Sequence, residues 1–294
     1  MMDRKKLLLL YNPSAGRAQT SRNLDMLLQK FCTGGCETTV YPILDGLNAE
    51  DILAGAESAG YDIVVCCGGD GTLHHTVNGL LRLEQPPLLG YIPSGSTNDF
   101  AASLGLPKTP EDAADAVVNG RPHAIDAGDF GGELFCYVAA FGAFSAVSYE
   151  TPQNMKNAMG HLAYIIEGVK RLPIGEKYPA RVEVGDQVFE EEFLFCSISN
   201  TTSIGGFSLD KSVEATLDDG EFEVLLIKAP TSVAEANTIV SKLLARDFNN
   251  ELIHADSVTV HFPTPTKWTL DGEYGGEHTD VSVQVLANAL HMVF

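Results

Sequence analysis

The chain has 294 residues, a hydrophobic content of 45% and a formal net charge of −20. This length is comfortable for two domains, and the composition is typical of an ordinary soluble globular protein. The charge argues against nucleic-acid binding, which requires dense lysine and arginine, and against lasting attachment to anionic membranes through a polybasic patch. It does not exclude a lipid substrate.

The apolar run at 7–11 is too short for a signal peptide, and no later run approaches the roughly 20 residues that span a bilayer. The cytoplasm is therefore the expected compartment. The six cysteines form no C-x-x-C pair. This favours reduced structural thiols over the alternatives of a metal site at Cys32 and Cys36 or a redox role.

Apolar strand-like runs alternate with helical patterns in the first part of the chain. This alternation predicts a mostly parallel sheet with crossover helices, and we assign residues 1–121 to this α/β domain. Thr109, followed by a proline and then Asp112, is a candidate helix N-cap, and Gly120 suits the end of that helix. The expected strands are 7–11, 37–43, 63–67 and 88–92, and the expected helices lie near 21–31, from 49, from 72 and from 110.

Longer strand-like runs follow residue 121, joined by Gly- and Asp-rich segments rather than crossover helices. They predict a mainly antiparallel, β-sandwich-like domain over residues 122–294. A short hinge near Arg121 and Pro122 is expected to leave a well-defined cleft between the two domains. The expected strands are 123–130, 133–144, 179–184, 188–199, 221–229, 257–262, 267–273 and 281–286, with helical segments around 156–171 and 232–246.

The most informative stretch is a buried-strand pattern at 63–67 that ends in Gly-Gly-Asp-Gly-Thr at 68–72. Glycines let backbone N–H groups approach an anion, and Thr72 is placed to open a helix whose N-terminus attracts phosphate. A carboxylate facing a phosphate is repulsive unless it holds a metal ion or its water, or accepts a proton from an attacking hydroxyl. Asp70 therefore favours kinase chemistry, and ATP beside so acidic a chain implies magnesium.

Two further loops are expected at the same edge of the sheet, because the carboxyl ends of parallel strands meet there. The first contains Asn12 and Ser14, which can bond a phosphate or a ribose, in a turn shaped by a proline and a glycine. The other, at 90–100, clusters hydroxyls and amides where a helix begins. Its alternative explanation is a simple N-cap, in which Asn98 or Thr97 bonds the first helical turn.

The order and spacing of the motifs resemble the catalytic domain shared by diacylglycerol kinases, sphingosine kinases and bacterial soluble lipid kinases. The resemblance covers nearly the whole chain, and its layout is closest to the bacterial diacylglycerol kinase and YegS-like lipid kinase group. GGDGT alone is shared with NAD kinases, so the ordered set carries the resemblance. The matching motifs are NPxxG at 12–16, GGDGT at 68–72, PSGSTNDF at 93–100, LDDG at 217–220 and DGE at 271–273.

The resemblance implies an ATP- and Mg-dependent lipid kinase that transfers the γ-phosphate to the hydroxyl of diacylglycerol or a related lipid. Glu273 is the implied proton acceptor, and Asp70 is expected to organise the catalytic magnesium and its waters. The implied ATP-binding residues are Asn12, Pro13, Ser14, Gly16, Gly69, Gly71, Thr72, Ser96 and Asn98.

The Asp-Asp-Gly turn carries a structural magnesium in this family. Asp219 is therefore expected to give a side-chain oxygen, with Thr216 and Glu221 giving backbone carbonyls. Asp218 then remains to face the cleft as a further catalytic carboxylate.

The same residues have simpler explanations. The segments at 217–220 and 271–273 each fit a β-turn that uses aspartate and glycine for geometry alone. The family usually has Asn-Glu where this chain has His74 and His75, so any role of that glutamate is missing or altered. A surface or packing role for the histidines is favoured over metal binding, because adjacent helix positions face different directions.

Two rival functions remain at this stage, a NAD kinase-like small-molecule kinase and a nucleotide- or lipid-binding regulator that has lost catalysis. The sequence does not name the lipid or the oligomeric state, for which a homodimer is one alternative. ATP and a lipid reached by transient contact with a membrane surface are the implied partners, since no anchor or basic amphipathic helix stands out. Core packing is the simpler explanation for the apolar residues that could line a cleft for the lipid. The candidates are the run 135–144 and Leu162, Ile165, Ile166 and Val169.

Overall fold

The computed structural model describes residues 4–15, 19–44, 47–143, 177–201, 203–204, 207–208, 217–245 and 252–294. The chain forms two compact units. The first extends to Ile125 and also includes Asn288–Phe294, and the second runs from Asp126 to Ala287. No helix in these ranges is both long enough and apolar enough to cross a membrane.

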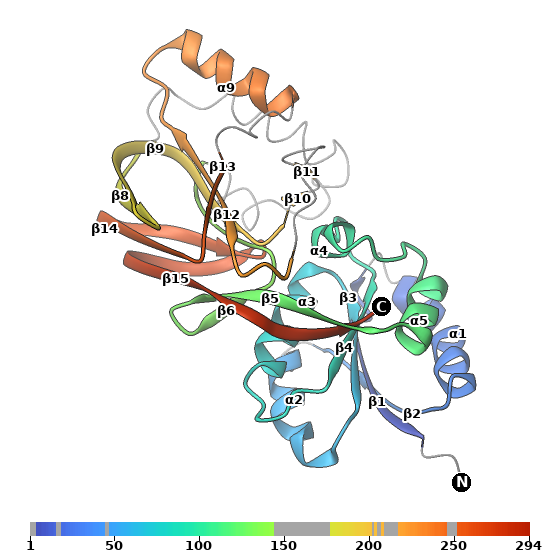
Figure 1. Ribbon diagram of the computed structural model, residues 1–294. Helices are drawn as coiled ribbons and strands as arrows, with labels where there is room; N and C mark the ends of the chain where they lie inside the picture. Colours follow the sequence, from blue (N-terminus) through green and yellow to red (C-terminus); the bar gives the residue numbers. More distant parts are fainter. Residues whose placement is uncertain are drawn as a thin grey trace. The chain divides into compact units, whose positions relative to one another are not determined.

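The first unit is built on a parallel sheet, as predicted (Figure 1). Its strands pair in the order β2-β1-β3-β4, and all three pairings are parallel. Both faces of β1 and β3 are buried, which explains why their sequences are continuous apolar runs rather than alternating ones. The strands are β1 (Lys5–Tyr11), β2 (Cys36–Pro42), β3 (Ile63–Gly68) and β4 (Leu88–Pro93).

Helices cover this sheet on both sides, with α1 and α5 on one side and α2 and α3 on the other (Figure 1). Phe31 of α1 and Val117 of α5 pack with Leu7, Leu9 and Val65, which point to that face of the sheet. The helices are α1 (Gln19–Thr33), α2 (Ala49–Ala56), α3 (Asp70–Leu80), α4 (Asp99–Ser103) and α5 (Pro110–Asn119), and a 3-10 turn, η2 (Glu57–Ala59), follows α2.

Helix α5 begins where the sequence predicts. The Thr109 side chain accepts a hydrogen bond from the backbone N–H of Asp112 (3.1 Å), and Pro110 fills the first helical position, where no N–H is needed. On α1, Lys30 reaches across to Asp115 and Glu111 of α5, which joins the two neighbouring helices at the surface.

The second unit is mainly antiparallel, as predicted, and four of its strands pair in a closed circuit. Strand β9 pairs with β8 through its first half and with β7 through its second half. Strand β14 likewise pairs with both β8 and β7. The bounds are β6 (Glu133–Phe135), β7 (Val138–Gly142), β8 (Tyr178–Val184), β9 (Gln187–Ser199), β10 (Ser203–Ile204), β11 (Phe207–Ser208), β12 (Phe222–Lys228), β13 (Leu252–Ala255) and β14 (Ser257–Leu270).

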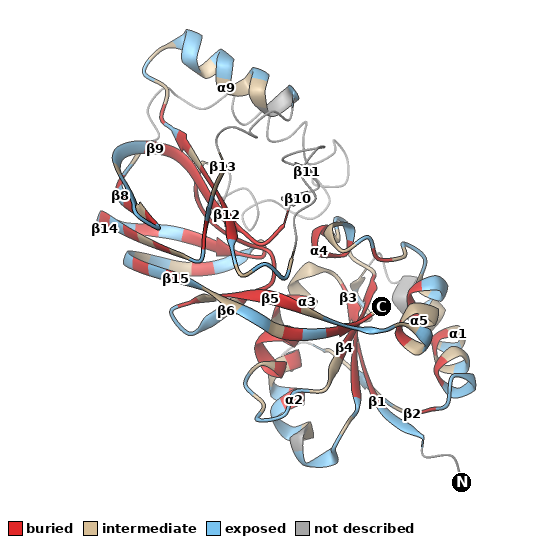
Figure 2. Ribbon diagram, in the orientation of Figure 1, coloured by how far each residue is buried: buried red, intermediate tan, exposed pale blue. Residues whose placement is uncertain are grey.

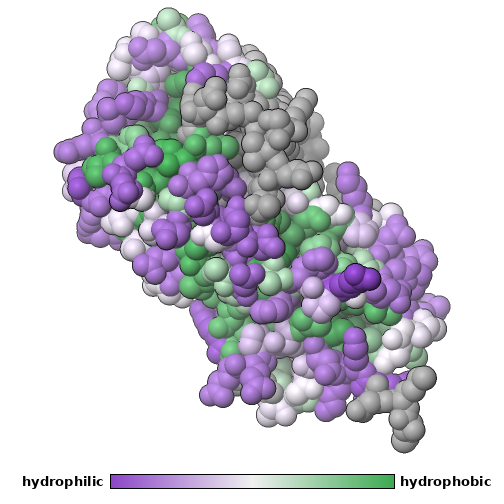
Figure 3. All heavy atoms as spheres, viewed as in Figure 1, coloured by the Kyte–Doolittle hydropathy of each residue, from purple (hydrophilic) through white to green (hydrophobic). Residues whose placement is uncertain are grey.

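An aromatic core fills this circuit. Trp268 and Phe141 are fully buried, and their rings lie 5.0 Å apart with Phe262 packed edge-on against both. Figure 2 shows the buried residues concentrated along the strands of each unit. Hydrophilic side chains spread over much of the viewed surface in Figure 3, as a net charge of −20 requires.

The last residues of the chain belong to the first unit, which differs from the predicted assignment of all of 122–294 to the second. Strands β5 (Pro122–Phe130) and β15 (Glu273–Val293) both pass from one unit to the other. Met292 of β15 lies opposite Leu89 of β4 in a parallel pair. Arg121 N–H donates to the Phe294 carbonyl (3.0 Å), so the end of the chain pairs beside the expected hinge.

Other boundaries also differ from the sequence analysis. The predicted strand at 133–144 is divided into β6 and β7, because the backbone N–H groups of Cys136 and Tyr137 donate to the Asp271 carboxylate. The predicted helix at 232–246 is α9 (Val233–Ala245). The predicted helix at 156–171, with Leu162, Ile165, Ile166 and Val169, lies outside the described residues.

Candidate functional site

Three loops of the first unit meet at the carboxyl ends of β1, β3 and β4. The backbone N–H of Asn12 donates to the Cys67 carbonyl (2.9 Å), which joins the first loop to the end of β3. The backbone N–H of Ser94 donates to the Gly68 carbonyl (2.7 Å), which joins the third loop to the glycine motif. The predicted convergence of the three loops at one sheet edge is confirmed.

The glycines of these loops are needed for close backbone approach. A Cβ atom added to Gly95 would lie 2.7 Å from the Gly69 Cα, and one added to Gly68 would lie 2.6 Å from the Thr72 side chain. Both distances are below normal van der Waals separation, so side chains at these positions would push the loops apart. The glycines therefore bring two backbones together, in addition to any contact with an anion.

Helix α3 begins at Asp70 rather than at Thr72. Gly69 occupies the N-cap position, and no side chain among the described residues caps the first turn. The first-turn N–H groups and the helix dipole of this 11-residue helix favour an anionic group at this end.

Asp70 connects the glycine motif to the third loop. Its Oδ2 accepts hydrogen bonds from the backbone N–H of Asn98 (2.9 Å) and from the Thr97 hydroxyl (3.3 Å). The Asn98 side chain bonds back to Gly95: Asn98 Oδ1 accepts from the Gly95 N–H (2.8 Å), and Asn98 Nδ2 donates to the Gly95 carbonyl (3.2 Å). The Asn98 side chain makes no capping hydrogen bond to α4. The simple N-cap explanation of this loop is therefore wrong, because Asn98 shapes the loop instead of bonding the helix.

The first loop reaches the same motif. Asn12 Nδ2 donates to the Thr72 hydroxyl (3.1 Å), and Asn12 Oδ1 accepts from the backbone N–H of Ser14 (2.9 Å). Pro13 is half-buried, whereas Ser14 and Ser96 are exposed. Of the predicted ATP-binding residues, Gly16 lies outside the described residues.

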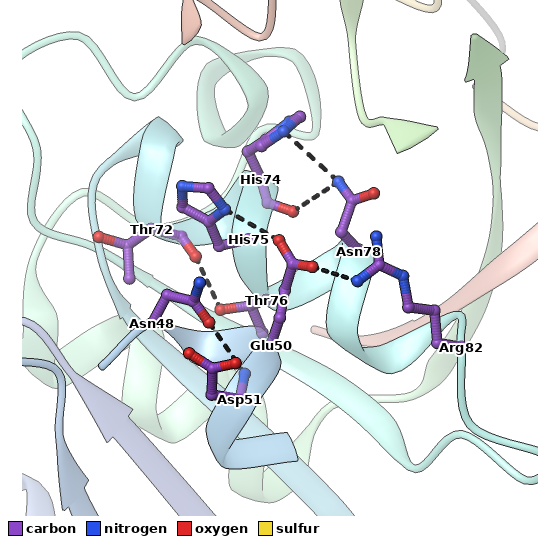
Figure 4. Close-up of polar contacts among 9 residues, drawn as sticks. All are labelled: Asn48, Glu50, Asp51, Thr72, His74, His75, Thr76, Asn78 and Arg82. Carbon is purple, nitrogen blue, oxygen red and sulfur yellow. Dashed lines mark hydrogen bonds and ion pairs between the residues drawn. The ribbon is translucent and has the colours of Figure 1, made fainter. Parts of the chain in front are cut away.

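The two histidines of α3 have separate roles. His74 is buried, and its carbonyl accepts from the Asn78 side chain (3.1 Å), as Figure 4 shows. His75 points toward α2, where its Nδ1 lies 3.1 Å from Glu50, and Arg82 binds the other oxygen of Glu50. His74 thus packs inside the unit, and His75 pairs with a carboxylate of the neighbouring helix.

The Asp-Asp-Gly turn of the second unit is held by a buried carboxylate. Asp126 is fully buried, and its Oδ2 accepts from the backbone N–H of Gly220 (2.7 Å). Asp218 and Asp219 are exposed, and Asp219 Oδ1 accepts from the backbone N–H of Glu221 (3.1 Å). Thr216, the other predicted contributor to this turn, lies outside the described residues.

Glu223 lies two residues beyond Glu221 and is a buried carboxyl that the sequence analysis did not single out. Burial raises the pKa of its carboxyl to about 7, and the nearby Asp219 and Glu221 charges act in the same direction. Its Oε2 is buried and has no hydrogen-bond partner among the described residues.

The late Asp-Gly-Glu motif forms the turn between β14 and β15. Asp271 is buried, and its carboxylate accepts from the backbone N–H groups of Cys136, Tyr137 and Val138. Glu273 is exposed at the start of β15.

The predicted carboxylates are divided between the two units. Asp70 belongs to the first unit, and Asp218, Asp219 and Glu273 belong to the second, so their convergence on one phosphate stays a prediction. Asp99 and Asp126 are buried carboxylates that the sequence analysis did not single out. For Asp126 the sequence signal is an aspartate within an apolar run, Ile125-Asp126-Ala127, whereas Asp99 follows the polar segment 94–98 and has no such signal.

Comparisons with known proteins identify the family. The model of the diacylglycerol kinase catalytic domain matches residues 6–130. A diacylglycerol kinase of Bacillus subtilis (strain 168) is 33% identical over 278 residues, which cover 92% of this chain and 91% of that protein. The chain belongs to the diacylglycerol kinase family.

Further relatives agree with this membership. A diacylglycerol kinase of Staphylococcus saprophyticus subsp. saprophyticus is 34% identical over 280 residues, covering 93% of this chain and 90% of that protein. A solved diacylglycerol kinase structure from Bacillus anthracis str. Sterne has the same fold, with a TM-score of 0.80 at 24% identity, covering 100% of this chain and 98% of that one. This member of the diacylglycerol kinase family is a kinase.

Proposed function

We propose that this kinase transfers the γ-phosphate of ATP to the hydroxyl of a lipid, with diacylglycerol as the first candidate, and that the transfer depends on magnesium. The observation that carries the proposal is the joining of three loops around the start of α3, where Asn12, Asp70, Thr72 and Asn98 are linked by hydrogen bonds. The lipid is taken from the names of the relatives, which are diacylglycerol kinases.

The residues present suit a magnesium ion at the Asp-Asp-Gly turn. Mg²⁺ prefers hard oxygen ligands, which the Asp219 carboxylate and the Glu221 carbonyl supply. The buried Glu223 oxygen that lacks a hydrogen bond among the described residues would be compensated by a nearby cation. No cluster of three metal-binding side chains occurs in the described ranges, so backbone carbonyls would have to complete the set.

The mechanism we propose divides the work among the chain's own residues. Glu273 accepts the proton of the attacking hydroxyl, for which its exposed carboxylate is available. The N–H groups at the start of α3 bind the phosphates and stabilise the charge that develops on the transferred group. Asp70 would hold a magnesium ion, which would supply positive charge to neutralise the phosphates.

The test is transfer of radiolabelled γ-phosphate from ATP to a panel of lipids in mixed micelles, with NAD as a competing acceptor. We expect label in diacylglycerol or a close relative, and its loss when EDTA removes magnesium. Glu273→Gln should lower the rate of transfer by about 10²- to 10⁴-fold and leave a measurable residual rate, whereas Glu277→Gln, which removes an exposed carboxylate from the same strand, should leave transfer unchanged.

Other results would change the assignment. Label in NAD alone would contradict a lipid acceptor, and label nowhere would favour a regulator without catalysis. Access to the lipid by transient membrane contact is checked in parallel, by sedimentation of the protein with vesicles that do or do not contain diacylglycerol.

A further inference from the structure

The backbone conformation of the turn before Glu273 does not by itself explain why the turn contains an aspartate, Asp271. Leu270 lies opposite Glu273, and the two residues between them, Asp271 and Gly272, have φ angles of 52° and 85°. Two consecutive residues with positive φ make a tight hairpin turn that favours either Asn-Gly or Asp-Gly. The turn alone therefore requires no charge at Asp271.

The carboxylate of Asp271 is nevertheless buried and fully engaged by backbone donors. Its Oδ2 accepts from Cys136 N–H (2.8 Å), and its Oδ1 accepts from the N–H groups of Tyr137 (3.0 Å) and Val138 (3.2 Å). Only 3% of Asp271 is exposed. Hydrogen bonds to an ionised acceptor are shorter and stronger than those between neutral groups, so this contact is a firm anchor.

The main chain of Asp271 is attached to the same segment. Its N–H donates to the Val138 carbonyl (2.8 Å), and its carbonyl accepts from the Tyr137 hydroxyl (3.1 Å). The turn is thus attached through both its backbone and its side chain to the segment between β6 and β7. That segment gives up regular strand pairing at Cys136 and Tyr137 to make these bonds.

We infer that Asp271 is a positioning residue that fixes the Glu273 carboxylate for proton transfer. Glu273 follows two residues later, is exposed, and has no comparable burial of its own to hold it. A catalytic base must lie within hydrogen-bond reach of its proton, and a misplacement of about 1 Å can cost about 100-fold in rate. The inference rests on the proposed function, because it assigns Asp271 to the same proton transfer.

Asp271→Asn separates the two roles of this residue. It keeps the turn preference, since Asn-Gly suits the same conformation. Its amide has one oxygen where the carboxylate has two, so an N–H₂ group would face at least one backbone donor at Cys136, Tyr137 or Val138. We expect kcat to fall about 100-fold with little change in the KM for ATP, together with faster amide hydrogen exchange at residues 136–138.

Two further variants keep the result interpretable. Asp129→Asn is the matched control, because Asp129 also accepts a turn N–H, that of Gly132 (2.6 Å), and should leave kcat unchanged. Tyr137→Phe removes a single bond to the Asp271 carbonyl and keeps the carboxylate contacts, so it should fold and should lower kcat less than Asp271→Asn.

The deciding measurement combines Asp271→Asn with Glu273→Gln. If Asp271 acts through Glu273, Asp271→Asn should lower kcat no further in a protein that already carries Glu273→Gln, because the two effects are coupled. An equal proportional loss in both backgrounds, an unchanged kcat in Asp271→Asn, or full activity of Glu273→Gln would each overturn the inference while phosphate transfer by the wild type stands. Absence of transfer by the wild type would instead contradict the proposed function, and the inference with it.

Discussion

At the scale of single residues, the contact between Gly69 and Gly95 brings two backbones of the candidate nucleotide site close together. A Cβ atom at position 95 would lie 2.7 Å from the Gly69 Cα, and backbone cannot move aside as a flexible side chain can. We predict that Gly95→Ala destabilises the protein by about 1 to 3 kcal/mol and strongly reduces phosphate transfer. Urea unfolding and the kinase assay measure the two effects.

The control for this prediction is Gly55→Ala. Gly55 lies in α2, and a Cβ there would meet nothing within 4 Å. Because alanine is the better helix former, that variant should be neutral or slightly stabilising. A Gly95→Ala protein that matched Gly55→Ala in stability and activity would contradict the close approach of the two loops.

The cysteines make a second prediction at this scale. All six are free thiols, and Cys32 alone among them is exposed. Burial raises the pKa of the Cys66 thiol to about 12 and that of Cys67 to about 11. Since the thiolate is the reactive form, the thiols of Cys66 and Cys67 should stay protonated and unreactive in the native protein between pH 7 and pH 9.

A thiol-reactive chromophore should therefore label one cysteine in the native protein and six after denaturation. Cys32→Ser should remove the native labelling. Rapid labelling of a second thiol in the folded protein would show that a buried cysteine is accessible.

The glycine motif was readable from sequence because its residues are adjacent and their conformational needs are local. Asp126 and Asp271 were not assigned their contacts, because their partners lie 94 and 135 residues away. A buried aspartate reads in the sequence as a polar interruption of a strand or as a turn residue. Only the fold shows which backbone donors it satisfies.

At the scale of elements, α2 packs against α3, the helix that begins within the glycine motif. Glu50 of α2 holds His75 of α3 and also Arg82, which lies just beyond the end of α3 (Figure 4), and a Cβ at Gly79 of α3 would lie 2.9 Å from the Glu50 Cα. We predict that Glu50→Ala costs on the order of 1 kcal/mol of unfolding free energy.

Arg82→Ala is the comparison, because it removes one exposed partner and leaves the Glu50–His75 contact in place. Its cost should be smaller, and the double variant should cost less than the sum of the two, since the residues share one carboxylate. Strict additivity in urea unfolding would argue that the crossing contact contributes nothing.

The strands of the first unit were predicted well because a parallel strand covered on both faces is a continuous apolar run. The strands of the second unit were predicted less well, and β13 (Leu252–Ala255) was not predicted at all. Strand β15 (Glu273–Val293) corresponds to one short predicted run at 281–286, because its polar residues interrupt the alternating pattern. The closed circuit of β7, β8, β9 and β14 depends on pairings between distant segments, which no local pattern encodes.

At the scale of the whole molecule, the first unit depends on the end of the chain. Met292 is fully buried and lies beside Leu89, and Val293 packs in the core of the first unit. We predict that Met292→Ala lowers the unfolding free energy by about 2 to 5 kcal/mol. The neighbouring His291→Ala is the control, because His291 is exposed and should cost less than about 0.5 kcal/mol.

Calorimetry of the two variants, with and without ATP, measures the difference. Equal melting temperatures would contradict a structural role for this terminal segment. The sequence analysis placed this segment in the second domain because it follows the other strands of that domain in the sequence. The return of its last residues to the first unit is fixed by the Arg121–Phe294 hydrogen bonds and by the stacking of Phe294 on His123.

This return has a consequence for how the protein is made. A ribosome produces the strands β1 to β4 early, yet Met292 and Val293, which complete their sheet and core, are synthesised only after the whole of the second unit. The unit that is begun first is therefore completed second. A message that stops before the codon of Asn288 yields a first unit that lacks part of its own sheet and core, so we expect such a protein to be inactive even though every proposed catalytic residue has been translated.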